Sequence, residues 1–255
     1  MKTIAIANRK GGVGKSTTAA ALMGGLTIRG YRVLGIDLDA QRNLSSTTRG
    51  KGDKTILGVL TGEITAAEAV NHTETGDIIP ASRSLAGADT ILTETGKEYR
   101  LREALETVAD NYDYCIIDCP PALGILTVNA LTAADNVIIP AQADIFSLEG
   151  IEDLYESFLA VKKYCNPNLA IMGVLLTRYN ARSNLTQDAT ELASRLAAKI
   201  GTTVFNTRIR EGVAVRESQI VQENLFTYAP KANVTGDYRA FIEEVLAKEK
   251  EQEGR

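Results

Sequence analysis

The chain has 255 residues, of which 44% are hydrophobic, so it is long enough to bury a large core. A formal net charge of −4 excludes a generally basic nucleic-acid binder, and any DNA contact must come from a local cationic patch. Aromatic residues make up 5% and tryptophan is absent, which argues against a base-stacking surface.

Membrane, export and metal signals are weak. The first three residues lead directly into an apolar run, so we expect no signal peptide, and no run approaches the roughly 20 residues of a membrane span. Cys115, Cys119 and Cys165 lack disulfide-framework or zinc spacing, and we expect reduced, structural thiols. His72, the only histidine, lies in a polar segment and is expected to be solvated, which disfavours histidine-based catalysis.

The most informative stretch is residues 4–18, with the sequence IAIANRKGGVGKSTT. Its apolar start, Ile4 to Ala7, is typical of a buried parallel strand, and residues 8–14 form a loop with three glycines. A run of good helix formers, Ala19 to Met23, comes soon after. Strand, glycine loop and helix together predict a phosphate-binding loop.

The chemistry of this loop favours a nucleotide triphosphate. Glycines allow the backbone to approach a polyphosphate, and the loop amides and the positive end of the helix attract it. We expect Lys15 to reach the β- and γ-phosphates, Ser16 to complete a Mg²⁺ shell and Thr17 to donate to the α-phosphate. The expected ATP-binding residues are Lys10, Gly11, Gly12, Val13, Gly14, Lys15, Ser16 and Thr17.

The loop departs from the common pattern G-x-x-x-x-G-K-[ST], because Arg9 occupies the first glycine position and Lys10 adds a second lysine. In this respect it resembles the deviant Walker A loop of the ParA/MinD ATPases. The resemblance implies that Lys10 contacts the nucleotide of a partner subunit, so that ATP is sandwiched in a homodimer and Lys10 and Lys15 both act in catalysis. The alternative interpretation of Lys10 is a solvated loop cation.

A second buried strand is expected over Arg32 to Asp37, followed by Asp39 two positions on. Because side chains alternate along a strand, the carboxylates of Asp37 and Asp39 would point to the same side. They would lie at the strand end where ligands bind in open α/β sheets. The segment resembles the family motif D-x-D-P-Q-G-N, with Ala40 and Arg42 replacing the proline and the glycine. The resemblance implies that Asp39 orients or activates the attacking water and that Asp37 lies near Mg²⁺ through water. For both residues a strand-end cap or surface charge is the alternative.

The strand expected over Tyr112 to Asp118 ends at two prolines, which supply no ladder donor. An apolar strand that ends in aspartate is the form expected of a second Mg²⁺-site element. Because Mg²⁺ keeps several waters, we expect Asp118 to hold one of those waters rather than the metal itself.

The remaining pattern alternates strands and helices. Short helices are expected near residues 56–60 and 66–70, with further strands at 77–80, 136–140, 170–177 and 204–205. Ile151, Leu154, Phe158 and Val161 form one apolar helix stripe, and longer helices are expected at 186–200 and 238–246. This predicts a single doubly wound α/β domain over residues 1–255, with a mostly parallel sheet flanked by helices and a frayed, charged tail at 248–255.

The wider resemblance, to ParA/Soj partition ATPases, covers nearly the whole chain and includes Leu148-Glu149-Gly150 and Gly173-Val174-Leu175-Leu176-Thr177. It implies an ATP- and Mg²⁺-dependent dimer in the cytoplasm that coats nucleoid DNA without sequence preference. A ParB-type centromere-binding partner would stimulate slow hydrolysis, and so drive segregation of a chromosome, plasmid or integrative element.

Arginines of the C-terminal third give that region a local cationic character despite the acidic whole. By resemblance to a DNA-contacting segment Arg182 is the first candidate, with Arg210 and Arg216 next because Ala214 stands where the family has an arginine. Contacts of this kind give salt-dependent binding without sequence choice. Solvated helix-face charge is the alternative interpretation for each.

Three rival functions share parts of this pattern. A MinD-type membrane-cycling ATPase would need an amphipathic C-terminal helix, whereas residues 247–255 are charged on all sides. An iron–sulfur carrier would need cysteines at the dimer seam, and Cys115 inside a strand is badly positioned for that. A nucleotide switch without hydrolysis is the third, and it predicts ATP-dependent dimerisation without phosphate release.

Overall fold

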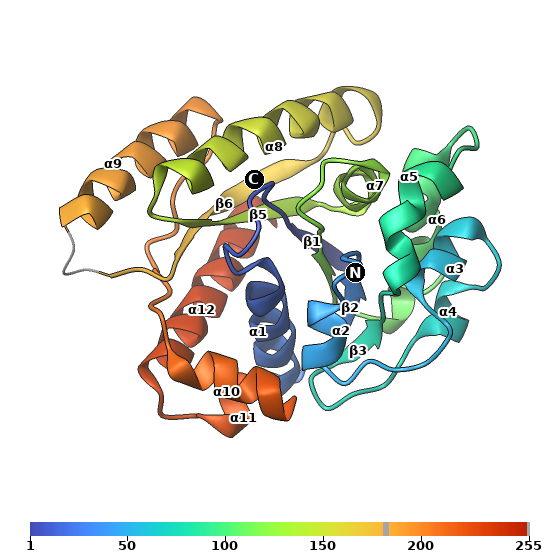
Figure 1. The fold of residues 1–255 in the computed structure, drawn as a ribbon, viewed down its shortest axis with the longest axis horizontal. Coiled ribbons are helices and arrows are strands. Elements are labelled where there is room, and N and C mark those ends of the chain that lie inside the picture. Colours follow the sequence, from blue (N-terminus) through green and yellow to red (C-terminus); the bar gives the residue numbers. More distant parts are fainter. Residues whose placement is uncertain (181–183, 254–255) are drawn as a thin grey trace.

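Among the described residues, six strands form one sheet in the order β3-β2-β4-β1-β5-β6 (Figure 1), and every pairing between them is parallel. The computed structural model describes residues 1–180 and 184–253. The fold class expected from the sequence, a doubly wound parallel sheet flanked by helices, is confirmed. The strands are β1 Lys2–Ile6, β2 Val33–Asp37, β3 Asp77–Ile79, β4 Tyr114–Asp118, β5 Asn136–Gln142 and β6 Ala170–Thr177.

Helices connect these strands and cover both faces of the sheet (Figure 1). The α-helices in chain order are α1 Lys15–Ile28, α2 Asn43–Thr47, α3 Ile56–Thr61, α4 Ala66–Ala69, α5 Ala88–Ile91, α6 Arg100–Glu106, α7 Ile125–Ala133, α8 Ile145–Tyr164, α9 Asn184–Lys199, α10 Val213–Val221, α11 Leu225–Tyr228 and α12 Asn233–Glu253. The described part of the chain also contains three 3₁₀ helices, η1 Arg83–Gly87, η2 Lys97–Tyr99 and η3 Ala109–Asn111.

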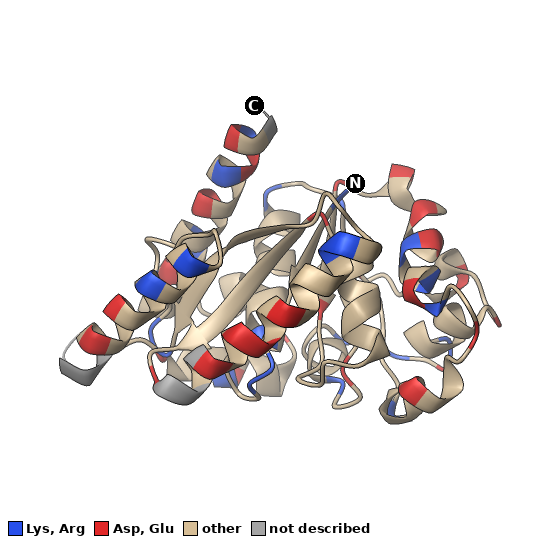
Figure 2. Ribbon diagram, turned by 90° about the horizontal axis from the view of Figure 1, so that it is seen from above, with Lys and Arg blue, Asp and Glu red and all other residues tan. Residues whose placement is uncertain are grey.

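Alternation along the strands divides the core into two layers. Ile4 and Ile6 of β1 pack with α1, α11 and α12 on one face of the sheet. Ala5 and Ala7 face the opposite layer, which α3 to α9 supply. Because both faces are covered, the strands are apolar along their whole length, and Figure 2 shows the charged residues gathered on the outer helices. Among the described residues, no helix is both long and apolar enough to span a membrane.

Two sequence-based expectations about the C-terminal third are wrong. The strand expected at 204–205 is reduced to an isolated bridge between Val204 and Val174 of β6. The tail expected to fray from residue 248 is instead helical to Glu253, the last described residue of α12. Its Glu249 is buried, and one carboxylate oxygen accepts a 2.8 Å hydrogen bond from the Tyr114 hydroxyl, which ties the helix end to β4.

Candidate nucleotide-binding site

The glycine loop follows the carboxyl end of β1 and leads into α1, as the sequence predicts. Gly12 and Gly14 have φ values of 78° and 91°, a left-handed conformation that glycine adopts without steric cost. Side chains from the neighbouring strands hold its carbonyls. Thr177 Oγ1 donates to the Val13 carbonyl at 2.8 Å and Gln142 Nε2 donates to the Gly12 carbonyl at 3.0 Å. With these carbonyls bound, the loop amides remain as donors for an anion.

Lys15 is held inside this loop. Its side chain is buried, and Nζ donates to the Lys10 carbonyl at 3.0 Å. Burial lowers the pKa of Lys15, while the nearby Asp118, Cys119 and Asp39 act in the opposite direction. The ammonium is therefore largely desolvated before any ligand arrives, a state in which a phosphate is a strong partner.

A cleft of about 490 Å³ opens in front of the loop. It brings together residues from the loop, the segment after β2, the end of β6 and α10. Its walls include Gly11, Gly12, Gly14, Lys15, Ser16, Thr17, Asp39, Gln41, Asn43, Pro121, Arg178 and Gln219. The structure thus places Asp39 and six of the eight loop residues expected to bind ATP around one cavity, and Lys10 and Val13 do not line it.

Asp118 ends β4 at the floor of the site and is completely buried. Among the described residues, neither of its carboxylate oxygens accepts a hydrogen bond of regular geometry. Burial first, and then the charge of Asp37, raise the pKa of Asp118 well above its usual range, while Ser16 and Lys15 oppose the shift. A buried, unsatisfied carboxylate beside a hydroxyl fits a hydrated Mg²⁺ as its missing partner.

Asp37 is buried too, but its oxygens are occupied. One accepts the Asp39 amide at 3.0 Å, and the other accepts the Ser45 amide at 2.8 Å and the Ser45 hydroxyl at 2.6 Å. Burial is the largest cause that raises the pKa of Asp37, and these hydrogen bonds act against it. The structure therefore favours the strand-end cap over metal ligation for Asp37.

Asp39 and Lys10 belong to the same region but differ in exposure, because Asp39 is buried and Lys10 is exposed. Asp39 lines the cleft, and its Oδ1 accepts the Gln41 amide at 2.9 Å. The Lys10 side chain is exposed, and its amide donates to Asn8 Oδ1 at 2.9 Å. Arg9, at the position where the common motif has glycine, forms an ion pair with Asp153 of α8. The exposed position of Lys10 leaves it accessible to a second subunit.

The structure gives mixed results for the arginines proposed to contact DNA. Arg182 lies outside the described residues. Arg210 makes a bidentate ion pair with Asp237, in which Nε donates to Oδ2 at 2.7 Å and Nη2 donates to Oδ1 at 2.8 Å. Arg216 Nη1 is 3.9 Å from Glu211 Oε1. Part of the cationic character expected of this region is thus neutralised locally.

Several residues of the cleft were not identified as nucleotide-site residues in the sequence, and Gln219 and Arg178 are the most informative of them. Gln219 of α10 donates through Nε2 to Thr17 Oγ1 at 3.0 Å, across 202 positions of chain. Arg178 follows β6 with a φ of 47° and lines the cleft. No local motif marks either one, and the positive φ of Arg178 is visible only in the structure.

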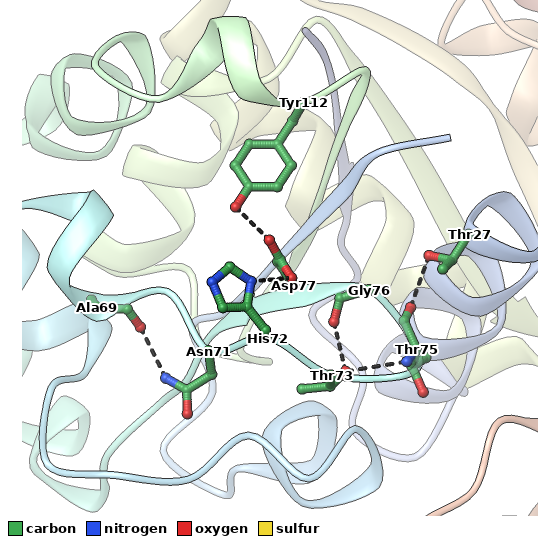
Figure 3. Close-up of polar contacts among 9 residues, drawn as sticks. All are labelled: Thr27, Ala69, Asn71, His72, Thr73, Thr75, Gly76, Asp77 and Tyr112. Carbon is green, nitrogen blue, oxygen red and sulfur yellow. Dashed lines mark hydrogen bonds and ion pairs between the residues drawn. The ribbon is translucent and has the colours of Figure 1, made fainter. Parts of the chain in front are cut away.

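The single histidine belongs to a different polar cluster (Figure 3). His72 Nδ1 lies 2.8 Å from Asp77 Oδ1, and the Tyr112 hydroxyl donates to Asp77 Oδ2 at 2.8 Å. Burial, and then the Asp77 hydrogen bond, raise the pKa of Tyr112. Asp77 begins β3, so this cluster lies at the amino edge of the parallel sheet, opposite the phosphate loop. It has no contact with the nucleotide cleft.

Two of the three cysteines lie in β4 or directly after it. Cys115 in β4 and Cys119 directly after it are completely buried, and burial raises the pKa of both thiols. Cys165, at the end of α8, is partly exposed. The buried positions agree with packing in the core rather than with contact to a second subunit.

A parallel sheet with a glycine-rich loop after β1, and with aspartates ending two adjacent strands, defines a P-loop nucleotide-binding protein. A family model described as an AAA domain matches residues 1–171. The chromosome partitioning protein ParA of Caulobacter vibrioides is 38% identical over 263 residues, which cover 100% of this chain and 97% of that protein. The chain belongs to the ParA/Soj family of P-loop ATPases.

Two further comparisons extend this likeness. The sporulation initiation inhibitor protein Soj of Bacillus subtilis is 38% identical over 252 residues, covering 96% of this chain and 98% of that protein. The structure also resembles cobyrinic acid a,c-diamide synthase from Mycobacterium smegmatis, solved with a bound ATP analogue and magnesium. That likeness has a TM-score of 0.85 and 33% identity, over 100% of this chain and 97% of the other.

Proposed function

We propose that this protein is an ATP- and Mg²⁺-dependent ATPase that dimerises around its nucleotide, binds DNA without sequence preference and drives segregation of a DNA cargo. The observation that supports this most is the pair of lysines on one loop, the buried Lys15 and the exposed Lys10, above the unsatisfied carboxylate of Asp118. The partition relatives and the nucleotide-bound neighbour support the same assignment.

The chemistry is in-line attack of water on the γ-phosphate, in which positioning and charge neutralisation provide the catalysis. Lys15 exchanges its bond to the Lys10 carbonyl for phosphate oxygens, and Thr17 donates to the α-phosphate. Ser16 and Asp118 would hold the metal, Asp118 through a water, and Mg²⁺ would supply further neutralisation of the phosphate charge. Asp39 orients the attacking water, and Lys10 reaches the nucleotide of the partner subunit.

The base would occupy a smaller cleft of about 100 Å³ beside the main one. The two share Gly14, Thr17, Arg178 and Gln219, so a nucleotide with its phosphates at the loop can extend into both. Tyr238 and Ile209 add apolar surface to this second wall. We assign this cleft to adenine.

The rest of the proposed cycle follows the relatives. A ParB-type partner stimulates slow hydrolysis, and the chain acts as a single ATPase domain that is cytoplasmic and associated with the nucleoid. DNA contact comes from Arg182 and exposed neighbouring cations. Arg210 would have to release Asp237, and Arg216 would have to turn from Glu211, before they could contribute.

The test is the rate of phosphate release from ATP, measured with and without duplex DNA and across a salt series. We expect slow basal turnover that DNA stimulates, with ATP-dependent DNA retention that weakens steeply with salt. ATP-dependent dimerisation without phosphate release under all conditions would instead support a nucleotide switch. Co-sedimentation with anionic vesicles in ATP, combined with no DNA effect, would support a membrane-cycling ATPase and contradict the proposal.

A further inference from the structure

A second cleft opens at the same carboxyl edge of the sheet, beyond the nucleotide site. It has a volume of about 590 Å³ and is bounded by the segment after β2, the start of α3 and the turn after β3. None of the phosphate-loop residues lines it. The loop between Asp39 and Asn43 separates the two clefts, because Gln41 and Asn43 face the nucleotide cleft while Arg42 faces this one.

Three cationic side chains converge on this cleft from three different segments. Arg42 follows β2, Lys54 precedes α3 and Arg83 begins η1. Asp53 and Glu63 also lie on its walls, so cations outnumber carboxylates there. Lys54 has a partner, Glu68 at 3.6 Å, but both side chains are about half exposed and such a pair is weak. Within residues 1–180 and 184–253, Arg42 and Arg83 have no ion pair.

Two hydrogen-bond donors in the walls of the cleft are buried without an acceptor. Arg42 Nε and Ser82 Oγ both lack a hydrogen-bond partner among the residues that the structure describes. Buried donors are normally satisfied, and an exception calls for a missing acceptor. An oxyanion that enters the cleft would supply one to both groups.

The backbone conformation of Arg42 makes the contribution of its side chain testable. Its φ is 62°, a left-handed conformation that is uncommon for residues other than glycine, asparagine and aspartate. Glycine would adopt this conformation without steric cost, so Arg42→Gly removes the side chain without straining the backbone. Arg42 is the N-cap residue of α2, and its amide donates to the Asp39 carbonyl at 2.9 Å. Arg42 therefore joins the wall of this cleft to the loop that carries Asp39.

We propose that Arg42, Arg83 and Ser82 form a second phosphate-binding site, separate from the nucleotide cleft. Its ligand carries a phosphate group, either as a free polyphosphate or as part of a DNA backbone. Guanidinium groups recognise phosphate with paired donors, and two of the three named residues carry them. If the ligand is DNA, the proposal rests on the proposed function, whereas binding of a free polyphosphate is independent of it.

The first experiment uses the full chain saturated with ADP and Mg²⁺, which occupies the phosphate loop, and titrates pyrophosphate by calorimetry. We expect one pyrophosphate per chain, with affinity at least tenfold weaker in Arg42→Gly combined with Arg83→Ala. Arg49→Gly is the matched control, because Arg49 has a φ of 60° and does not line the cleft. Glycine adopts the left-handed conformation of residues 42 and 49 without steric cost. Neither variant should therefore have a lower melting temperature than the wild type.

The second experiment measures retention of duplex DNA in the presence of ATP across a salt series. Loss of pyrophosphate binding together with a salt slope reduced by about two would identify DNA phosphates as the ligand. Loss of pyrophosphate binding with unchanged DNA retention would identify a free phosphate compound. If the double variant matches the wild type in both experiments, the proposal is overturned. A wild type that neither hydrolyses ATP nor retains DNA would remove the proposed function while leaving the pyrophosphate result valid.

Discussion

Asp37 and Asp118 are register partners at the carboxyl ends of β2 and β4, yet among the described residues only Asp37 accepts hydrogen bonds of regular geometry. Both carboxylates are buried, and the proximity of Asp37 contributes to the raised pKa of Asp118. The free protein therefore maintains a costly arrangement that a divalent cation would relieve. The binding site is built at the expense of stability, as functional sites often are.

Asp118→Asn should stabilise the nucleotide-free protein at neutral pH while abolishing Mg²⁺-dependent nucleotide binding. It removes a buried charge that has no hydrogen bond, for which a gain of about 1–3 kcal/mol is expected. Chemical denaturation and nucleotide titration measure the two effects. Asp37→Asn is the control and should destabilise, because the Ser45 and Asp39 donors lose part of their acceptor. A destabilised Asp118→Asn protein would contradict this account of the site.

The same pair predicts how stability depends on pH. Both carboxyls have pKa values raised above 3.8, so above that pH the folded state holds protons that the unfolded state releases. Their contribution to the free energy of unfolding is thus present at low pH and lost as the pH rises through the folded-state values. The measurement is the difference between wild type and Asp118→Asn in urea unfolding from pH 4 upward. We expect the advantage of the variant to grow with pH, and a constant difference would refute the assignment.

The two loop lysines should separate nucleotide binding from assembly. Lys15→Ala should abolish ATP binding, because it removes the buried cation of the cleft. Lys10→Ala should bind ATP as a monomer, yet lose ATP-dependent dimerisation and hydrolysis, because its exposed side chain serves the partner. Fluorescent-nucleotide titration and light scattering distinguish these outcomes. Normal ATP-dependent dimers of Lys10→Ala would show that position 10 is only a solvated cation.

Asp39→Ala should leave ATP binding and dimerisation intact while lowering turnover at least a hundredfold, since general-base or water-orienting groups contribute about 10²–10⁴-fold. Asp39 lines the cleft, and its hydrogen bond to the Gln41 amide fixes its position. Single-turnover assays on the ATP-loaded dimer measure the chemical step. Unchanged turnover would remove Asp39 from the mechanism.

Gly150 of α8 packs closely against Asn8 and Lys10 of the phosphate loop. Replacing it with alanine should weaken nucleotide binding. An added Cβ would lie 2.5 Å from Asn8 Oδ1 and 3.2 Å from the Lys10 amide nitrogen. Asn8 cannot yield easily, because it is buried and donates to the Pro140 carbonyl at 2.8 Å. We expect a destabilisation of about 1–3 kcal/mol and roughly tenfold weaker ATP binding.

Gly236→Ala is the matched control for this substitution. Gly236 lies in α12 with no heavy atom within 4 Å of an added Cβ. Alanine should therefore stabilise the helix by about 0.5–1 kcal/mol and leave nucleotide affinity unchanged. Thermal melts and nucleotide titrations of the two variants provide the comparison. Equal effects of both substitutions would show that α8 does not position the loop.

Much of the fold could be predicted because its signals are local. The glycine loop before Lys15 needs only adjacent residues to define its conformation, and apolar strands ending in Asp37 and Asp118 indicate a parallel sheet. The strand predicted at Val204 failed because sheet pairing depends on a distant partner, and β6 offers it only one bridge. Likewise, the charged tail could not be recognised as helix without the buried contact between Glu249 and Tyr114.

The sequence by itself determined the phosphate loop, the order of the strands and helices along the chain, and the family likeness, since each depends on neighbouring residues. Only the tertiary structure decided that Gln219 meets Thr17, that Asp237 pairs with Arg210, and that Asp37 is satisfied while Asp118 is not. Those relationships join residues up to 202 positions apart, or depend on burial. Burial sets the energy of a charge, and a chain acquires it only when its layers pack together.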